Sequence, residues 1–201
     1  MKRIIYILIL AAGVFAAKET SAQTVGEFGY QISFPTGDFS DFIKKTSFVG
    51  FTGGARATLS NKRLSIGGNG AWFYFPDKRG VETIDLKEGG TVNGYFTNYT
   101  NIYGLYAVGQ YDLKDNKEMA VPFLRLGIGG AYQNQRQDVG LYSFQADGVQ
   151  FLLNGEAGVR LSKDGMRGIT LAATYYWLPE ASDMVSTSFF GIKLGIVNSK
   201  Y

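Results

Sequence analysis

Six charged side chains stand singly in segments of the sequence where apolar residues occupy every second position. They are Glu27, Arg56, Arg125, Glu156, Arg160 and Lys193. If these segments are strands, the charges share the face opposite the apolar one. Charges enclosed by a small closed sheet must pair, because an unpaired charge in a low-dielectric interior costs several kcal/mol. These charges predict ion pairs that close the interior of the sheet. If the interior is packed more loosely, they would instead line a narrow polar path for small solutes.

Two ion pairs follow from the expected order of the segments. Arg125 and Glu156 lie in consecutive segments, so they are expected to face each other. If the last segment closes on the first, Lys193 comes to lie beside Glu27. Because an eight-stranded closed sheet is just wide enough for its side chains to fill, we expect a charge network in the lumen.

The residues of most enzyme active sites are absent. The chain contains no histidine and no cysteine, which excludes Cys–His pairs, Ser–His triads and histidine metal sites. Carboxylates in the expected loops are scattered and are interpreted as solvated charges: Asp38, Asp41, Glu82, Asp85, Glu88, Asp138, Asp147, Glu180 and Asp183. The glycines at 127–130 lie inside an expected strand, so they form no phosphate loop. The sequence therefore predicts no catalytic residue, no metal and no cofactor.

The N-terminus has the three-part layout of a secretory signal peptide. Lys2 and Arg3 precede an uncharged apolar run over 4–17, and small residues end at Ala22. We expect cleavage after residue 22, which leaves 23–201 as the mature domain; an uncleaved anchor helix is the alternative. The absence of cysteine excludes a lipid-anchored lipoprotein. The net charge is +3 for the whole chain and close to neutral without residues 1–22, which argues against nucleic acid as a partner.

The elements that position the charges are strands. In 27–34, Phe28, Tyr30, Ile32 and Phe34 share one face, and small or polar residues share the other. This alternation predicts eight strands, near 26–35, 48–59, 64–75, 97–111, 121–134, 148–161, 168–178 and 188–198. A tilted strand needs about 9–11 residues to cross a bilayer, whereas strands of globular proteins have about 5–6. The expected strands therefore favour a membrane barrel.

The connections alternate in length. Those at 60–63, 112–120 and 162–167 are short or moderate, and those at 36–47, 76–96, 135–147 and 179–187 are longer. Short periplasmic turns and long extracellular loops are typical of outer-membrane barrels, and an even number of strands puts both termini in the periplasm. Within 76–96, a turn at 87–90 predicts a hairpin that extends the third and fourth strands above the membrane.

Aromatic residues concentrate near the strand ends, where the membrane interface is expected. They are Phe34, Trp72, Tyr74, Tyr99, Tyr111, Tyr132, Tyr175, Trp177 and Phe190. Ordinary β-propensity is the alternative explanation.

A soluble calycin barrel would alternate in the same way, with an apolar lumen and a polar exterior. Its exterior would be dense in lysine and glutamate, whereas the polar faces here are mostly glycine, serine, threonine and alanine. The predicted fold class is all-β, an eight-stranded antiparallel up-and-down transmembrane β-barrel.

Two short motifs carry a family resemblance. Thr20-Ser21-Ala22-Gln23 and the segment 34–39 (Phe-Pro-Thr-Gly-Asp-Phe) resemble the outer-membrane β-barrel proteins of Bacteroidetes-type bacteria. Residues 20–201 are similar to porin-like eight-stranded barrels of the OmpA-transmembrane and OmpW type. At the C-terminus the chain departs from the common pattern, because Asn198-Ser199-Lys200 separate the alternating residues from Tyr201. Barrel hydrolases and acyltransferases of the outer membrane rely on an active-site histidine, so the resemblance implies no enzyme.

The sequence thus favours a non-enzymatic integral barrel of a Gram-negative outer membrane, with a charge-paired lumen and extracellular loops for structural or binding roles. A narrow porin-like channel for small solutes and an accessory subunit of a secretion or assembly complex remain open. Expected partners are outer-membrane lipid and lipopolysaccharide, the barrel-assembly machinery, and a protein bound through loops or periplasmic turns.

Overall fold

The computed structural model describes residues 24–59, 63–85, 91–115, 118–140, 142–163, 167–181 and 184–200. In this part of the chain, one short helix and eight strands are formed. They are β1 (Thr24–Thr36), α2 (Asp38–Phe42), β2 (Val49–Thr58), β3 (Leu64–Asp85), β4 (Thr91–Asp112), β5 (Ala120–Val139), β6 (Tyr142–Ser162), β7 (Arg167–Leu178) and β8 (Thr187–Lys200). No helix among these residues is long and apolar enough to cross a membrane. The expected signal peptide, 1–22, lies outside the described residues.

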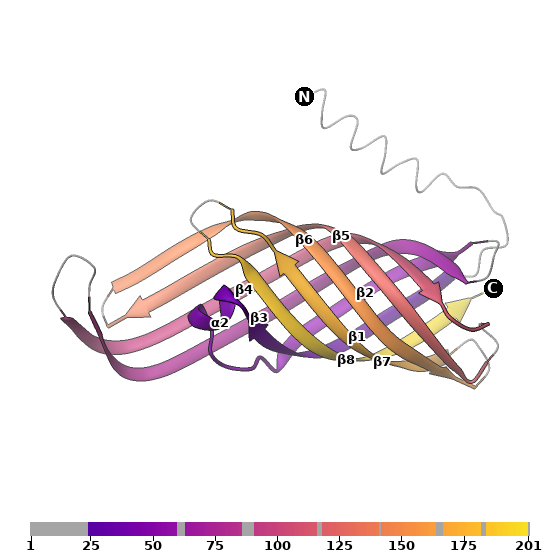
Figure 1. The fold of residues 1–201 in the computed structure, drawn as a ribbon, viewed down its shortest axis with the longest axis horizontal. Helices are drawn as coiled ribbons and strands as arrows, with labels where there is room; N and C mark the ends of the chain where they lie inside the picture. Colours follow the sequence, from indigo (N-terminus) through magenta and orange to yellow (C-terminus); the bar gives the residue numbers. More distant parts are fainter. Residues whose placement is uncertain are drawn as a thin grey trace, which may run out of the picture.

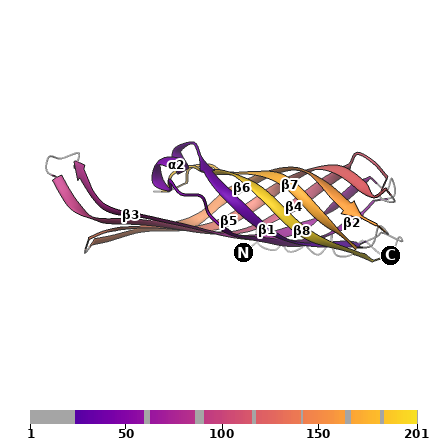
Figure 2. The same ribbon diagram turned by 90° about the horizontal axis from the view of Figure 1, so that it is seen from below.

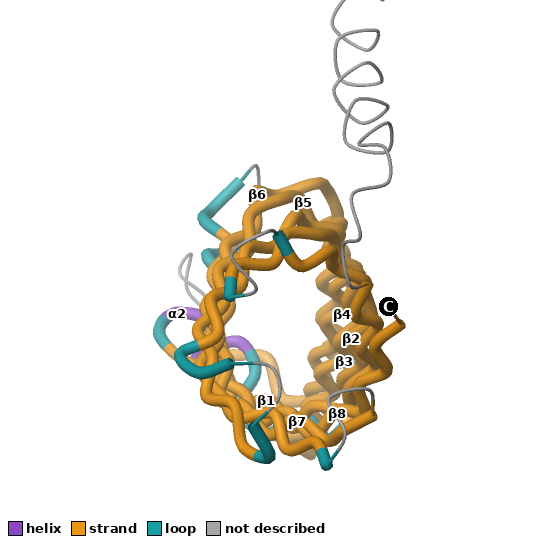
Figure 3. The backbone as a smooth tube through the Cα atoms, turned by 90° about the vertical axis from the view of Figure 1, so that its right-hand side faces the viewer, coloured by secondary structure: helices purple, strands orange, loops and turns teal. Residues whose placement is uncertain are grey.

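The strands close into one antiparallel barrel. Each strand pairs with the next, and β8 pairs with β1 along its length, from Thr24 opposite Lys200 to Thr36 opposite Ser188 (Figures 1 and 3). The predicted eight-stranded up-and-down barrel is confirmed. Both ends of the described chain lie at the end where the turns are short, on the right of Figure 1.

The two faces of the barrel wall carry different side chains, because residues alternate between them along each strand. Apolar side chains point outward and are open to their surroundings, as at Leu105 (75% exposed) and Leu126 (73% exposed). Charged and amide side chains on the intervening positions point into the lumen, where Gln31 and Arg125 are 0% and 1% exposed. This inside-out pattern is the one that a wall surrounded by hydrocarbon requires.

Four neighbouring strands are much longer than the rest. β3 to β6 have 20–22 residues, whereas β1, β2, β7 and β8 have 10–14. Beyond the last β2 pair (Val49 opposite Tyr74) and the first β7 pair (Trp177 opposite Leu153), they continue as a four-stranded sheet (Figures 1 and 2). We call its outer part, residues 76–85, 91–99, 136–139 and 142–145, the protruding sheet.

The hairpin expected within 76–96 is confirmed, because β3 and β4 remain paired as far as Asp85 opposite Thr91. The expected loop at 135–147 is wrong. β5 and β6 stay paired to Val139 opposite Tyr142, and Gly140, which directly follows the last β5 pair, has a positive φ of 58°. The segment resembles a loop in the sequence because both faces of this part of the sheet carry polar residues.

The connection after β1 contains the helix α2, which the sequence did not predict. Phe39 and Ile43 are fully buried against the barrel mouth. The segment is tied to the opposite wall: the backbone N–H of Lys44 donates to Asp77 over 3.0 Å, and Asn98 Nδ2 donates to the carbonyl of Phe42 over 2.6 Å. Residues 37–47 therefore fold over the mouth of the lumen instead of forming an open loop.

Candidate functional site

Glu27 on β1 is the centre of a buried ionic cluster in the lumen. Its Oε2 lies 2.8 Å from Nη1 of Arg56 and 2.7 Å from Nη2 of Arg125, and its Oε1 lies 2.6 Å from Nζ of Lys193. These residues come from β2, β5 and β8. The cluster therefore connects β1 to its two neighbouring strands and, across the lumen, to β5. One carboxylate thus holds three cations.

Arg125 extends the cluster to β4 and β6. Its Nη1 lies 3.2 Å from Oε2 of Glu156, whose Oε1 is also 2.6 Å from Nζ of Lys193. Its Nε and Nη2 donate to Oε1 of Gln110 over 2.9 and 2.6 Å. The two pairs expected from the sequence, Arg125 with Glu156 and Lys193 with Glu27, are both present as contacts.

A further pair lies at the edge of the cluster. Arg160 Nη2 is 3.2 Å from Oδ2 of Asp112, and Gln110 Nε2 donates to Oδ1 of Asp112 over 2.6 Å. The structure therefore brings together all six charges singled out in the sequence and adds two residues that sequence reasoning missed. The register could have found Gln110, because it pairs directly with Arg125 and so shares its face. We call these eight residues the ionic layer: Glu27, Arg56, Gln110, Asp112, Arg125, Glu156, Arg160 and Lys193.

The charges of the ionic layer nearly cancel. Among the described residues it holds four cations and three carboxylates, all less than a tenth exposed. Removing one partner from such a buried network leaves uncompensated charge, which destabilises a protein by about 3–5 kcal/mol. The arrangement is suited to hold the barrel shut and to fix the relative positions of six strands.

Nearer the mouth, the lumen is filled by six aromatic rings, which the sequence did not predict there. We call Phe39, Phe73, Phe75, Tyr106, Tyr176 and Phe189 the aromatic layer. Phe189 is at its centre, with ring centroids 4.9 Å from Phe73, 5.1 Å from Phe75 and 4.9 Å from Tyr176. Phe39 of α2 packs on Phe75 at 5.1 Å, so the helix forms the top of the layer.

Tyrosines mark the boundary between the two layers. The hydroxyls of Tyr106 and Tyr176 lie 3.1 Å apart, and both side chains are buried. Tyr106 has room because Gly127 and Gly129 face it: a Cβ at Gly127 would come within 2.7 Å of the ring, and one at Gly129 within 2.5 Å of the Tyr106 Cα. The small residues on the lumen face therefore leave the space that the large side chain of Tyr106 fills.

The carboxylates of the expected loops are dispersed. Asp38 and Asp41 lie in the first turn of α2, Asp138 is 2.8 Å from Arg136, and Asp147 accepts a hydrogen bond from Tyr132. Glu180 is exposed, the side chains of Glu82 and Asp85 are not described, and Glu88 and Asp183 lie outside the described residues. No group of three or more acidic side chains that could hold a metal ion occurs in the described ranges.

All nine aromatic residues noted near strand ends lie on the outer face of the wall. Phe34, Tyr74 and Tyr99 are half-buried by their neighbours, and the other six are exposed. Trp72 and Tyr132 belong to a row of direct cross-strand partners that also includes Tyr30, Phe51 and Tyr103. Tyr111 lies at the other end of the barrel, opposite Leu64.

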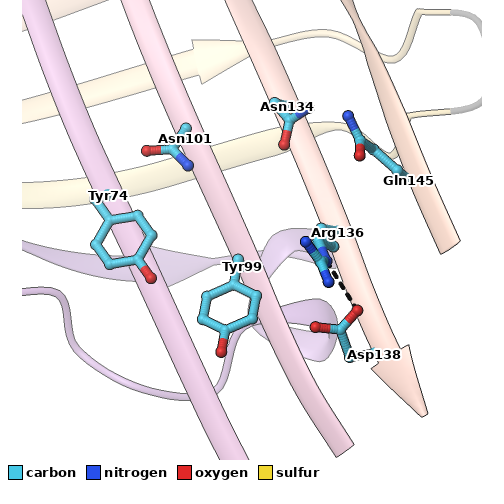
Figure 4. A pocket seen from close by; sticks show the side chains of 7 residues that line it. All are labelled: Tyr74, Tyr99, Asn101, Asn134, Arg136, Asp138 and Gln145. Atoms are coloured by element: carbon cyan, nitrogen blue, oxygen red, sulfur yellow. Dashed lines mark hydrogen bonds and ion pairs between the residues drawn. The ribbon is translucent and has the colours of Figure 1, made fainter. Parts of the chain in front are cut away.

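A shallow depression of about 450 Å³ lies on the outer face above this aromatic row. It is lined by Tyr74, Tyr99, Asn101, Asn134, Arg136, Asp138 and Gln145, which we call the polar wall patch (Figure 4). The rings of Tyr74 and Tyr99 are nearly parallel, 6.2 Å apart at 11°. The hydrogen bond from Arg136 holds the pKa of Asp138 below its usual value, so the carboxylate stays charged beside its partner.

No protein-family model matches the sequence, and no curated protein matches it significantly. Solved structures resemble the fold. Ail, the attachment invasion locus protein of Yersinia pestis, solved with the heparin analogue sucrose octasulfate, superposes with a TM-score of 0.56 at 13% identity, over 90% of this chain and 100% of Ail. Neisserial surface protein A superposes with a TM-score of 0.52 at 10% identity, over 89% of this chain and 97% of that protein. The chain therefore has the fold of the eight-stranded outer-membrane β-barrels.

Proposed function

We propose that this protein is an integral, non-enzymatic barrel of a Gram-negative outer membrane, whose closed lumen makes it a rigid support for a binding surface outside the cell. Residues 1–22 are the export signal and 23–201 the barrel. The likeness to Bacteroidetes-type barrels and to the OmpW type belongs to this proposal as an expectation from the sequence motifs.

The outer wall supports the membrane placement. Large apolar side chains on adjacent strands are exposed there, including Leu105, Leu126, Leu171, Leu194 and Ile196. A contiguous apolar surface of this extent would be a liability in water, whereas hydrocarbon satisfies it.

The filled lumen is the observation that carries the non-conducting role. The ionic and aromatic layers follow one another along the barrel, and the central side chains of both are buried. A solute would have to separate Glu27 from its cations and then displace the ring of Phe189. These contacts argue against the channel, the alternative that the sequence left open.

The protruding sheet supports the binding role and the orientation. It is formed by the long hairpins β3–β4 and β5–β6 at the end opposite both ends of the described chain, and long extensions beyond the wall are on the extracellular side in outer-membrane barrels. On its β7 side, β6 has no strand partner from Tyr142 to Leu152 among the described residues. Such an edge can accept an extended segment of a partner protein. The β3 edge is instead interrupted by Pro76 and by a bulge between Lys78 and Gly80.

Cysteine labelling tests the placement, because the chain has no cysteine of its own. Three single substitutions sample the two ends and the wall: Tyr95→Cys (70% exposed), Met119→Cys (76% exposed) and Leu126→Cys (73% exposed). In intact cells a membrane-impermeant maleimide is expected to label only the variant at position 95. After permeabilisation of the outer membrane it should also label the variant at 119, and the variant at 126 should stay protected by lipid until the protein is denatured.

The three variants control for one another, since all three native side chains are well exposed in the structure. Labelling at 119 but not at 95 in intact cells would reverse the orientation. Labelling at 126 in intact cells would contradict the membrane placement itself.

A further inference from the structure

The polar wall patch has the chemistry of a saccharide-binding surface. The parallel rings of Tyr74 and Tyr99 offer a flat apolar face, on which the C–H face of a pyranose ring can stack. Around them, Asn101, Asn134 and Gln145 present carboxamides, which can donate to one sugar hydroxyl and accept from another. Figure 4 shows these side chains side by side on four strands.

The register explains why these residues meet. Tyr74, Asn101 and Asn134 are direct cross-strand partners, and one pleat farther out so are Tyr99, Arg136 and Gln145. Cross-strand partners on one face lie about 5 Å apart, so these side chains form one continuous surface. The patch is therefore built into a paired sheet rather than into a loop.

Several of its polar groups remain available. Among the described residues, the carboxamides of Asn101 and Gln145 make no side-chain hydrogen bond to the protein. Arg136 and Asp138 are paired at 2.8 Å, so their charges cancel. An uncharged polyhydroxylated ligand suits this set better than a free phosphate would.

The position of the patch indicates where the saccharide comes from. The next row toward the barrel is aromatic, with Trp72, Tyr103 and Tyr132 as direct partners, and beyond it the wall is apolar at Leu105 and Leu126. Tryptophan and tyrosine prefer the level at which hydrocarbon gives way to headgroups. The polar wall patch thus lies at the level of the headgroups of the surrounding lipids.

We propose that the polar wall patch binds a pyranose headgroup of a glycolipid in the surrounding outer leaflet. This inference rests on the membrane placement in the proposed function. It assigns a particular site on the wall, with Tyr74 and Tyr99 as the stacking platform and the carboxamides as hydroxyl partners.

Hydrogen exchange of the full mature chain in nanodiscs tests the site. Three samples are compared: discs of phospholipid alone, discs that contain lipopolysaccharide, and phospholipid discs with the delipidated core oligosaccharide in solution. We expect lipopolysaccharide to slow exchange across 97–101 and 134–138, and the free oligosaccharide to do so only at concentrations at least about tenfold higher.

Substitutions then locate the contacts. Tyr99→Ala and the double variant Asn101→Ala/Gln145→Ala are expected to lower the amount of lipopolysaccharide retained on purification about tenfold. Tyr95→Ala, on the same face of β4 but outside the patch, and Gln137→Ala, on the opposite face of β5, should retain it as the native chain does.

The outcomes separate the possibilities. Equal protection by the free oligosaccharide would overturn the lipid source, and equal retention by patch and control variants would overturn the site. Because the discs carry lipopolysaccharide in both leaflets, the result does not depend on orientation in the cell. A failure here is therefore distinct from a failure of the cysteine-labelling test.

Discussion

The two layers of the lumen close the barrel by different physical means. The ionic layer depends on a few directional contacts, with Glu27 holding three cations and Arg125 reaching two carboxylates and Gln110. The aromatic layer depends on many weak contacts around Phe189 and on a helix that enters from the mouth. A single substitution should therefore disrupt the first layer as a unit, whereas it should leave a local cavity in the second.

The largest effect is expected for Glu27→Gln, which keeps the shape of the side chain and removes its charge. Arg56, Arg125 and Lys193 then face one another, and among the described residues Glu156 is the carboxylate that still pairs with Arg125 and Lys193. We expect a loss of about 3–5 kcal/mol in the free energy of unfolding. Urea unfolding in lipid vesicles, followed by the fluorescence of Trp72 and Trp177, measures it.

Glu118→Gln is the matched control, because Glu118 pairs with Lys114 over 2.8 Å but both side chains are about half exposed. Its effect should stay below about 1 kcal/mol. Similar losses for the two variants would show that the buried charges do not act as a network.

Phe189→Ala tests the aromatic layer. Removal of the central ring leaves a cavity among Phe73, Phe75 and Tyr176, and we expect a loss of about 3 kcal/mol. Phe190→Ala, at the next position on the outer face, should cost less, because no cavity forms where lipid can fill the space. A larger loss in the free energy of unfolding for Phe190→Ala than for Phe189→Ala would contradict this.

Gly129→Ala probes the space that small residues provide for Tyr106. The new methyl group would meet backbone and Cβ atoms at 2.3–2.7 Å, so we expect a loss of about 1–3 kcal/mol. At Gly155, a Cβ would meet nothing within 4 Å, and Gly155→Ala should be close to neutral. Equal unfolding midpoints for the two variants would contradict the packing described around Tyr106.

The smallest effect is expected for Asp77→Asn at the anchor of the α2 segment. Asp77 Oδ2 accepts from the N–H of Lys44 over 3.0 Å and from Nε of Arg79 over 2.9 Å. Weakening these bonds should cost about 1–2 kcal/mol locally and leave the barrel intact. Faster hydrogen exchange at residues 43–47, with unchanged exchange in β8, is the expected result.

The ionic layer was largely predictable from the sequence, and the aromatic layer was not. Alternation places Glu27 and Lys193 on one face, and closure of the sheet makes β8 the neighbour of β1. In the register Lys193 lies opposite Gln31 and Glu27 opposite Val197, so the length of the lysine side chain completes the pair. Asp112 was not predicted as a member of the layer, because it is the last residue of β4. Lys114 and Asp115 follow it closely, so in the sequence it resembles a turn residue.

The aromatic layer depends on a tertiary event that periodicity does not encode. Alternation from Thr170 and Thr174 puts Tyr176 on the lumen face of β7, but it does not show that rings from other strands meet Tyr176 there. The rings of Phe73 and Phe75 are favourable inside only because Phe39 and Ile43 cover them. The sequence did not predict the outer end of β5 for a related reason: residues 135–138 are polar on both faces, so no alternation marks them as a strand.

Single-channel recording in planar bilayers tests the closed lumen most directly. The purified native protein is expected to give no resolved current steps under an applied voltage, since both layers block the path. Regular unitary steps from the native protein, with an amplitude altered by Lys193→Met in the ionic layer, would contradict the account and establish a conducting path through the barrel.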